Sequence, residues 1–242
     1  MNNTDRHTDM PDNKPKIIRV CIEGKRALFT RPELVAERQS YPVPTKSALK
    51  GILRAVYKHD GMNYRILSIH VCNQIQTDVV WRNELTETQI YGENYTPKNY
   101  IDRNRRNCSS PRGTAFLKNV RYIVEAEIIQ LPHYWPDSKE HTLAEHYDIF
   151  YRHLRRGATQ HAPWIGCREF EANVEEYPQN KEIQTYYKNR KIDLGLILED
   201  LHYTLDGREY PVIAEAKIEN GTIIYGKRYY PEDYPREEVL DA

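Results

Sequence analysis

A row of four basic residues on one predicted helix is the first feature that could do chemistry. Between Pro44 and Gly61 a cation recurs at every fourth position, as Lys46, Lys50, Arg54 and Lys58. Residues four apart share a helix face, and like charges there destabilise a helix by roughly 0.2–0.5 kcal/mol per pair. A polyanion beside the helix, such as nucleic-acid phosphate, would balance them. The plainer alternative is a solvated helix face.

Further arginines extend this basic character into segments that we expect to be loops. Arg31 and Arg38 precede the helix, and Arg105 and Arg106 lie in a long polar segment from 82 to 114. The chain as a whole is neutral, with 35 basic and 35 acidic residues, so a cationic rim would be a local feature. We predict that this rim and the helix stripe contact RNA phosphate.

Histidines and cysteines raise the possibility of a metal site. The histidines concerned are His133, His141, His146, His153 and His161. None has HxH or HExxH spacing, and the four cysteines form no CxxC pair, so we predict no metal site and no cofactor. We expect the cysteines to be small buried hydrophobes.

Two amphipathic helices and several strands would position these side chains. Thr45 can cap a helix whose apolar face runs from Ala48 to Tyr57. A second helix over 142–157 has an apolar stripe of Leu143, Tyr147, Phe150 and Leu154 and ends at Gly157. Alternating patterns predict strands over 17–24, 64–76, 116–131 and 163–174.

The order of these elements predicts an α+β fold. It is the βαββαβ order of a ferredoxin-like (RRM-like) domain, with the segment 82–114 as a long hairpin or loop insertion. After residue 177 only strand patterns follow, over 191–203, 210–221 and 222–230, the last two joined by a hairpin at Asn220 and Gly221. We therefore expect a disordered tail (1–15), the ferredoxin-like domain (16–174) and a small antiparallel β subdomain (175–242).

The sequence contains no pattern typical of a membrane span or a secretory signal. No run of about 18 apolar residues could span a membrane, and the polar start of the chain has no apolar signal segment. Scattered, unpaired cysteines favour a reducing compartment. We expect a cytoplasmic protein with no membrane contact.

Six ordered blocks carry a resemblance to a known family. They are "ALFTRPE" (27–33), "ERQSYPVPTKSALKGILRAVY" (37–57), "HVCNQIQTDVVWRNE" (70–84), "LKNVRYIVEAEI" (117–128), "HYDIFYRHLRRG" (146–157) and "PWIGCREF" (163–170). Together they resemble the subtype I-C member of the fifth CRISPR-associated family, within the RAMP superfamily. The resemblance covers roughly residues 16 to 228.

The resemblance implies a function. Such proteins cut precursor CRISPR RNA at the base of its repeat hairpin without metal, using the neighbouring 2′-hydroxyl. They then stay on the 5′ handle of the mature RNA (crRNA) with the backbone and large subunits of the type I-C Cascade complex. The family's catalytic tyrosine and histidine correspond here to Tyr57 and His146. Relatives can have lysine just before that histidine, where this chain has Glu145.

Two other interpretations stay open. A non-cleaving RNA-binding subunit of the same kind of complex is favoured by Glu145, because a carboxylate cannot stabilise a phosphorane. Tyr57 could also be a plain core tyrosine, and His146 a histidine on the flank of its helix. A generic RNA binder of the RRM type is disfavoured, because no RNP1-like strand occurs.

Overall fold

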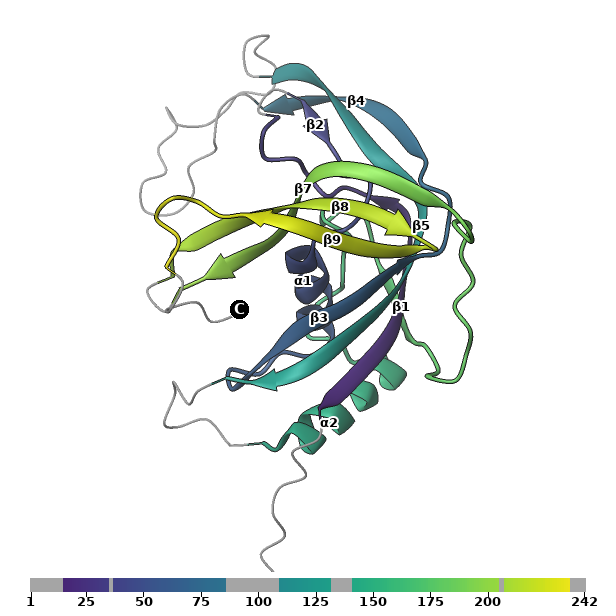
Figure 1. Ribbon diagram of the computed structural model, residues 1–242, viewed down its shortest axis with the longest axis vertical. Coiled ribbons are helices and arrows are strands. Elements are labelled where there is room, and N and C mark those ends of the chain that lie inside the picture. The colour runs from purple at the N-terminus through teal and green to yellow at the C-terminus, as the bar shows by residue number, and fades with distance from the viewer. Residues whose placement is uncertain (1–14, 35–36, 86–108, 132–140, 205–206, 236–242) are drawn as a thin grey trace, which may run out of the picture.

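The computed structural model describes residues 15–34, 37–85, 109–131, 141–204 and 207–235 (Figure 1). The predicted tail therefore lies outside the described residues, apart from Pro15. Neither α1 nor α2, the helices of the described part, has the length and apolar character needed to cross a bilayer.

Four antiparallel strands with two helices in their connections form the body of the fold. In sheet order the strands are β6 (Asn173–Glu176), β1 (Lys16–Ala27), β5 (Ser109–Gln130) and β3 (Met62–Val71). Helix α1 (Lys46–Val56) connects β1 to β3, and α2 (Leu143–Arg156) connects β5 to β6. The predicted α+β class is confirmed, and so are both predicted helices.

The C-terminal strands extend the same sheet. They are β7 (Lys191–Tyr203), β8 (Glu209–Glu219) and β9 (Thr222–Tyr229). The predicted hairpin is confirmed: Glu219 pairs with Thr222, and Asn220 and Gly221 both have positive φ, as a two-residue turn requires. Strand β9 meets β3 where Thr222 pairs with His70. The proposed division near residue 174 stays a prediction.

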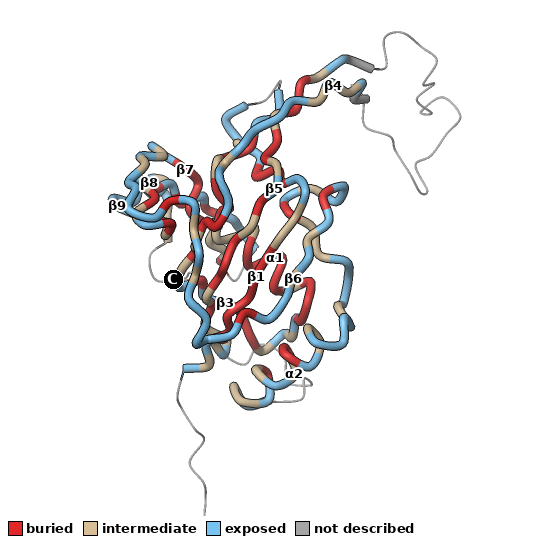
Figure 2. Tube along the Cα trace, turned by 90° about the vertical axis from the view of Figure 1, so that its right-hand side faces the viewer, coloured by how far each residue is buried: buried red, intermediate tan, exposed pale blue. Residues whose placement is uncertain are grey.

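The segment 82–114, predicted as a long hairpin or loop insertion, is a hairpin at both of its described ends. Strand β4 (Thr77–Leu85) pairs antiparallel with the first part of β5, and the short β2 (Arg38–Gln39) pairs parallel with it. Figure 2 shows this β4–β5 arm projecting from the body, with β4 mainly exposed. Polar strands in a solvated arm lack the apolar alternation that identified the others. Residues 86–108 between them lie outside the described part.

Two strand predictions were wrong in extent. Strand β3 ends at Val71, so the predicted strand over 64–76 is too long. The predicted strand over 163–174 is mostly loop, because regular pairing with β1 begins only at Asn173. Gly166 explains part of that loop: it has φ +81°, and an added Cβ would overlap the carbonyl oxygen of Leu28.

The apolar core lies between the strands and the helices. It includes fully buried side chains from β1, α1, β3, β5 and α2, among them Ile18, Leu53, Tyr64, Val124 and Phe150. Side chains of β7, β8 and β9 join the same cluster, so α1 is covered on more than one side. This enclosure of α1 decides where its basic stripe must point, as Figure 1 also indicates by placing α1 at the centre of the molecule.

Candidate active site

Tyr57 and His146 lie in direct contact. A hydrogen bond of 3.0 Å joins the Tyr57 hydroxyl oxygen to Nδ1 of His146, across 89 residues of sequence. The end of the first predicted helix therefore lies against the start of the second. Both side chains are buried, with 5% and 1% of their surfaces exposed.

The ends of the two helices hold this pair in place. Tyr57 is the C-cap of α1, where the backbone turns extended, and its carbonyl accepts a hydrogen bond of 2.7 Å from the Tyr64 hydroxyl. His146 stands in the first turn of α2, directly after the Thr142–Glu145 capping box. Each side chain is thus placed by local helix-end geometry rather than by a mobile loop.

Burial shifts the pKa values of both groups away from neutrality. Burial, followed by the neighbouring His59 and His141, lowers the pKa of His146 to about 4. Burial raises the pKa of Tyr57, which the charge of Arg152 partly opposes. At neutral pH the pair is therefore an uncharged phenol beside an uncharged imidazole, and a neutral imidazole can accept a proton.

Two further histidines line the same site. The His59 ring lies 5.1 Å from His146 and 5.2 Å from His141, and the rings of His141 and His146 are 5.5 Å apart. His59 and His141 are half-buried, so they are more accessible than the pair behind them. Among the described residues no cluster of histidine, cysteine and carboxylate groups has metal-binding geometry.

Sequence reasoning missed His59, because no motif or spacing in the sequence singled it out. His59 follows Tyr57 by two residues, and that closeness was the available signal. His141 was noticed only as part of a candidate metal cluster. A shared role for the two histidines needs the fold, since it brings the α1–β3 turn to the start of α2.

Glu145 has a structural role of its own. Its carboxylate accepts a hydrogen bond of 2.8 Å from the backbone N–H of Thr142, and the Thr142 hydroxyl in turn caps the Glu145 N–H. The hydrogen bond from the Thr142 backbone is the main reason that the pKa of Glu145 is lowered. This side chain, which is exposed, therefore caps α2 while the neighbouring His146 points inward.

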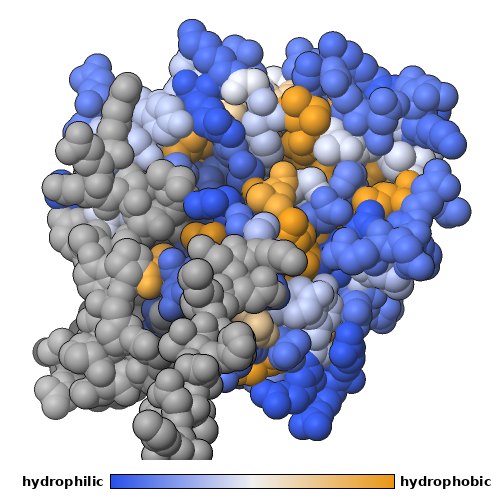
Figure 3. Space-filling model, turned by 60° about the horizontal axis from the view of Figure 1, so that its bottom comes forward, coloured by the Kyte–Doolittle hydropathy of each residue, from blue (hydrophilic) through white to orange (hydrophobic). Residues whose placement is uncertain are grey.

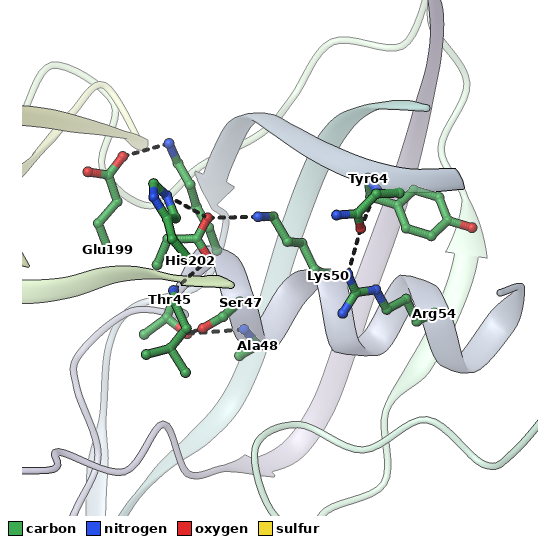
Figure 4. Close-up of polar contacts among 12 residues, drawn as sticks. Thr45, Ser47, Ala48, Lys50, Arg54, Tyr64, Glu199 and His202 are labelled. Atoms are coloured by element: carbon green, nitrogen blue, oxygen red, sulfur yellow. Dashed lines mark hydrogen bonds and ion pairs between the residues drawn. The ribbon is translucent and has the colours of Figure 1, made fainter. Parts of the chain in front are cut away.

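Two lysines of the basic stripe on α1 face carboxylates of β7 (Figure 4). Lys46 Nζ lies 2.6 Å from Glu199 Oε1, and Lys50 Nζ lies 2.9 Å from Asp200 Oδ2. The Lys50 and Asp200 side chains are both 6% exposed. These two lysines do not form the predicted outward-facing surface, because carboxylates of the same chain occupy the place expected for phosphate.

The partners of Glu199 keep its carboxylate ionised. Burial alone would raise the pKa of Glu199, but hydrogen bonds from Arg228 and Lys46 bring it below its usual range. Arg228 reaches both carboxylate oxygens of Glu199, at 2.6 and 2.9 Å. The basic stripe and the C-terminal strands are therefore joined through buried ion pairs.

The remaining predicted RNA contacts occupy different environments. Arg54 donates a hydrogen bond of 2.7 Å to the Asn63 side chain, whereas Lys58 is exposed beside Tyr57. Arg31 pairs with Glu33 at 2.9 Å, and Arg38 is exposed on β2. Arg105 and Arg106 lie outside the described residues. Figure 3 shows the end of the molecule near α2 as mainly hydrophilic, with apolar residues in separate patches.

Comparison with known proteins places this geometry in a family. A model of the CRISPR-associated protein family Cas_Cas5, in its Cas5d form, matches residues 17–229. The chain belongs to this Cas5 family. The resemblance seen in the six sequence blocks is thereby confirmed.

Two curated relatives match nearly the whole chain. The CRISPR pre-crRNA endoribonuclease Cas5d of Thermus thermophilus is 30% identical, covering 91% of this chain and 96% of the relative. The protein of the same name from Mannheimia succiniciproducens is 31% identical, covering 90% and 98%. A crystal structure described as a CRISPR-associated protein shares the fold, with a TM-score of 0.64, 24% identity, and coverage of 87% of this chain and 92% of that one.

Proposed function

We propose that this Cas5 family member is an endoribonuclease that cleaves precursor CRISPR RNA at the base of the repeat hairpin without metal. It then stays on the 5′ handle of the crRNA as a subunit of the type I-C Cascade complex, beside the backbone and large subunits. Two full-length relatives named pre-crRNA endoribonucleases support the activity. The observation that carries the proposal is the contact between Tyr57 and His146.

The chemistry uses the RNA's own 2′-hydroxyl. The 2′-oxygen attacks the neighbouring phosphorus and gives up its proton to a base. The bond from phosphorus to the 5′-oxygen breaks, and that oxygen takes a proton from an acid. The products are a 2′,3′-cyclic phosphate and a 5′-hydroxyl, so no water or metal-bound nucleophile is consumed.

We assign His146 as the base. Its pKa of about 4 keeps the ring neutral at physiological pH. If Nδ1 donates its hydrogen to the Tyr57 oxygen, then Nε2 carries the lone pair that accepts the 2′-hydroxyl proton. Tyr57 then fixes the tautomer and the orientation of the ring, and its own hydroxyl hydrogen is available to the reacting phosphate.

We propose that exposed cations hold the RNA backbone, both beside the site and on β2. Lys58 adjoins Tyr57 in the chain, and Arg38 is exposed on β2. Arg31, Arg105 and Arg106 remain predicted contacts, and Arg54 would have to leave Asn63 to take part. We do not carry Lys46 and Lys50 forward, since moving Lys50 to phosphate would take the ion-pair partner from the buried Asp200, and moving Lys46 would leave the buried Glu199 to Arg228 alone.

We also propose that the body of the fold is ferredoxin-like. The sheet order β6-β1-β5-β3, with a helix in the β1–β3 and β5–β6 connections, supports this assignment. In such an arrangement both helices lie on one face of the sheet, which brings the end of α1 to the start of α2.

The test is cleavage of the chain's own repeat RNA in EDTA, with analysis of the product ends. General acid–base participation contributes about 10²- to 10⁴-fold, so His146→Ala and Tyr57→Phe should each slow single-turnover cleavage substantially within that range. Tyr147→Phe is the matched control: it makes the same chemical change at the residue after His146 and should leave the rate unchanged. RNA affinity should stay nearly constant throughout.

A non-cleaving RNA-binding subunit is the second candidate, and the specific observation in its favour is Glu145. This carboxylate caps α2 beside the histidine, where it contributes no positive charge. Wild-type protein that binds repeat RNA but leaves it intact would select this candidate. Cleavage that stops in EDTA would reject the metal-independent reaction.

A further inference from the structure

The Tyr57–His146 pair is almost fully buried, so an approaching scissile phosphate also meets the more accessible groups around the pair. Only 5% of Tyr57 and 1% of His146 are exposed. His59 and His141 are half-buried, and their rings lie within 5.5 Å of the His146 ring. An RNA strand approaching the pair therefore encounters these two histidines.

The surroundings of His59 determine which ring nitrogen carries its hydrogen. The backbone N–H of Gly61 donates a hydrogen bond to Nδ1 of His59 at 3.2 Å. A backbone N–H can only donate, so Nδ1 must present its lone pair. The neutral ring then carries its hydrogen on Nε2, which is a donor and not a base.

The turn holds the ring in this arrangement. The N–H of Met62 donates to the carbonyl oxygen of His59 at 3.2 Å, which closes a turn from His59 to Met62. Strand β3 starts at Met62, so the turn is anchored on the sheet. The His59 donor is consequently preorganised, as stabilisation of a developing charge requires.

His141 is less suited to the same task. Its Nδ1 lies 3.6 Å from the Glu145 carboxylate, so the negative charge of the capping box sits beside this ring. That charge would repel a phosphate approaching His141, whereas the His59 ring accepts its hydrogen bond from a neutral amide. The two half-buried histidines are therefore not equivalent.

We infer that His59 donates its Nε2–H to a non-bridging oxygen of the scissile phosphate and stabilises the charge that builds there during cleavage. The inference rests on the proposed function. His59 transfers no proton: the 2′-hydroxyl proton goes to Nε2 of His146, the departing 5′-oxygen takes the Tyr57 hydroxyl proton, and Nδ1–H of His146 then restores the Tyr57 hydroxyl. As a donor that touches the reacting phosphate, His59 would be a third catalytic residue beside Tyr57 and His146.

Two amide substitutions separate the donor role from a structural role. His59→Asn retains an acceptor near the Nδ1 position for Gly61 but removes the outward donor. His59→Gln places an amide N–H near the Nε2 position. Loss of one such charge-stabilising donor costs about 10²- to 10³-fold in rate, so His59→Asn should slow single-turnover cleavage about 100-fold and His59→Gln less than 10-fold. Affinity for repeat RNA should change little in either variant.

The matched control is His70→Asn. The His70 ring bonds Ser68 and Thr222 on β3 and β9, and strand alternation turns it away from the core-facing Ile69 and Val71. This variant should cleave at the wild-type rate. Thermal melts of all three variants verify that each is folded.

The outcomes distinguish this inference from the proposed function. Wild-type rates for His59→Asn, or equal losses for folded His59→Asn and His59→Gln, would overturn the donor role while leaving the endoribonuclease intact. If the wild type does not cleave, or if His146→Ala cleaves normally, the proposed active site fails first. A 100-fold loss in His59→Asn with substantial recovery in His59→Gln supports the inference.

Discussion

Replacing Lys50 by methionine should destabilise the fold strongly while leaving RNA binding almost unchanged. The Lys50 ammonium lies 2.9 Å from Asp200, and both side chains are 6% exposed. Methionine retains most of the volume of lysine but leaves the Asp200 carboxylate buried without this partner. Removing one member of a buried ion pair costs about 3–5 kcal/mol.

The lower end of that range is the better expectation for this site. Nε2 of His202 lies 4.0 Å from the Asp200 carboxylate and can offset part of its charge when protonated. We therefore expect the free energy of unfolding to fall by about 3 kcal/mol. A chain of this size loses about 2–4 °C of melting temperature per kcal/mol, so Tm should drop by about 6–12 °C.

Urea denaturation followed by circular dichroism measures the loss of unfolding free energy in Lys50→Met. Two further variants show whether the loss comes from the unpaired Asp200 carboxylate. Lys50→Met combined with Asp200→Leu removes both charges and should recover most of the stability, since apolar replacement of a buried pair is often neutral. Lys58→Met makes the same change at an exposed position just beyond the end of α1 and should cost no more than about 0.5 kcal/mol.

The salt dependence of RNA binding tests whether Lys50 contacts Asp200 or RNA phosphate. A lysine that neutralises a phosphate contributes to the slope of log affinity against log salt concentration, and its loss makes the slope shallower. We expect the slope to be unchanged in Lys50→Met and reduced in Lys58→Met. A Lys50→Met protein as stable as the wild type, but with a shallower slope, would show that Lys50 serves RNA rather than Asp200.

Two other predictions follow from the same structure. Because the folded-state pKa of His146 is about 4, below the ordinary value of 6.5, the unfolded chain binds the proton first. The free energy of unfolding should therefore fall by about 2–3 kcal/mol between pH 6.5 and pH 4 because of His146. Urea titrations at several pH values should show a fall that is smaller by this amount in His146→Gln. An equal fall in the wild type and the variant would contradict the prediction. Gly166→Ala should destabilise by well over the roughly 1–2 kcal/mol expected for Gly157→Ala. Both glycines have positive φ, but an added Cβ would overlap the Leu28 carbonyl oxygen at Gly166 and would meet open space at Gly157. Similar melting temperatures for the two variants would refute this packing argument.

Local sequence patterns predicted most of the regular structure. The cap at Thr45 and the helix end at Gly157 both appear as expected. The turn at Asn220 and Gly221 does so as well. These features depend on backbone conformations and hydrogen bonds among residues only a few positions apart, so the sequence contains everything they need.

The proposed catalytic pair, Tyr57 and His146, was predicted by similarity to a family, and not by the pattern alone. From periodicity, Tyr57 continues the apolar face of α1, and it is indeed 95% buried, as a core tyrosine would be. What distinguishes it is the hydrogen bond to His146, 89 residues away. No local pattern encodes a contact across that distance.

Tertiary structure also decided what the basic stripe faces. The sequence by itself established that Lys46 and Lys50 share one helix face and that the charges there need a counter-charge. It could not tell a bound polyanion from Glu199 and Asp200, which lie about 150 residues further along the chain. The choice depended on β7 packing across α1, and the same kind of long-range packing brings His59 to His146. Helix ends and turns are settled by near neighbours, whereas the partner of a charge is settled by whichever distant strand the fold places beside it.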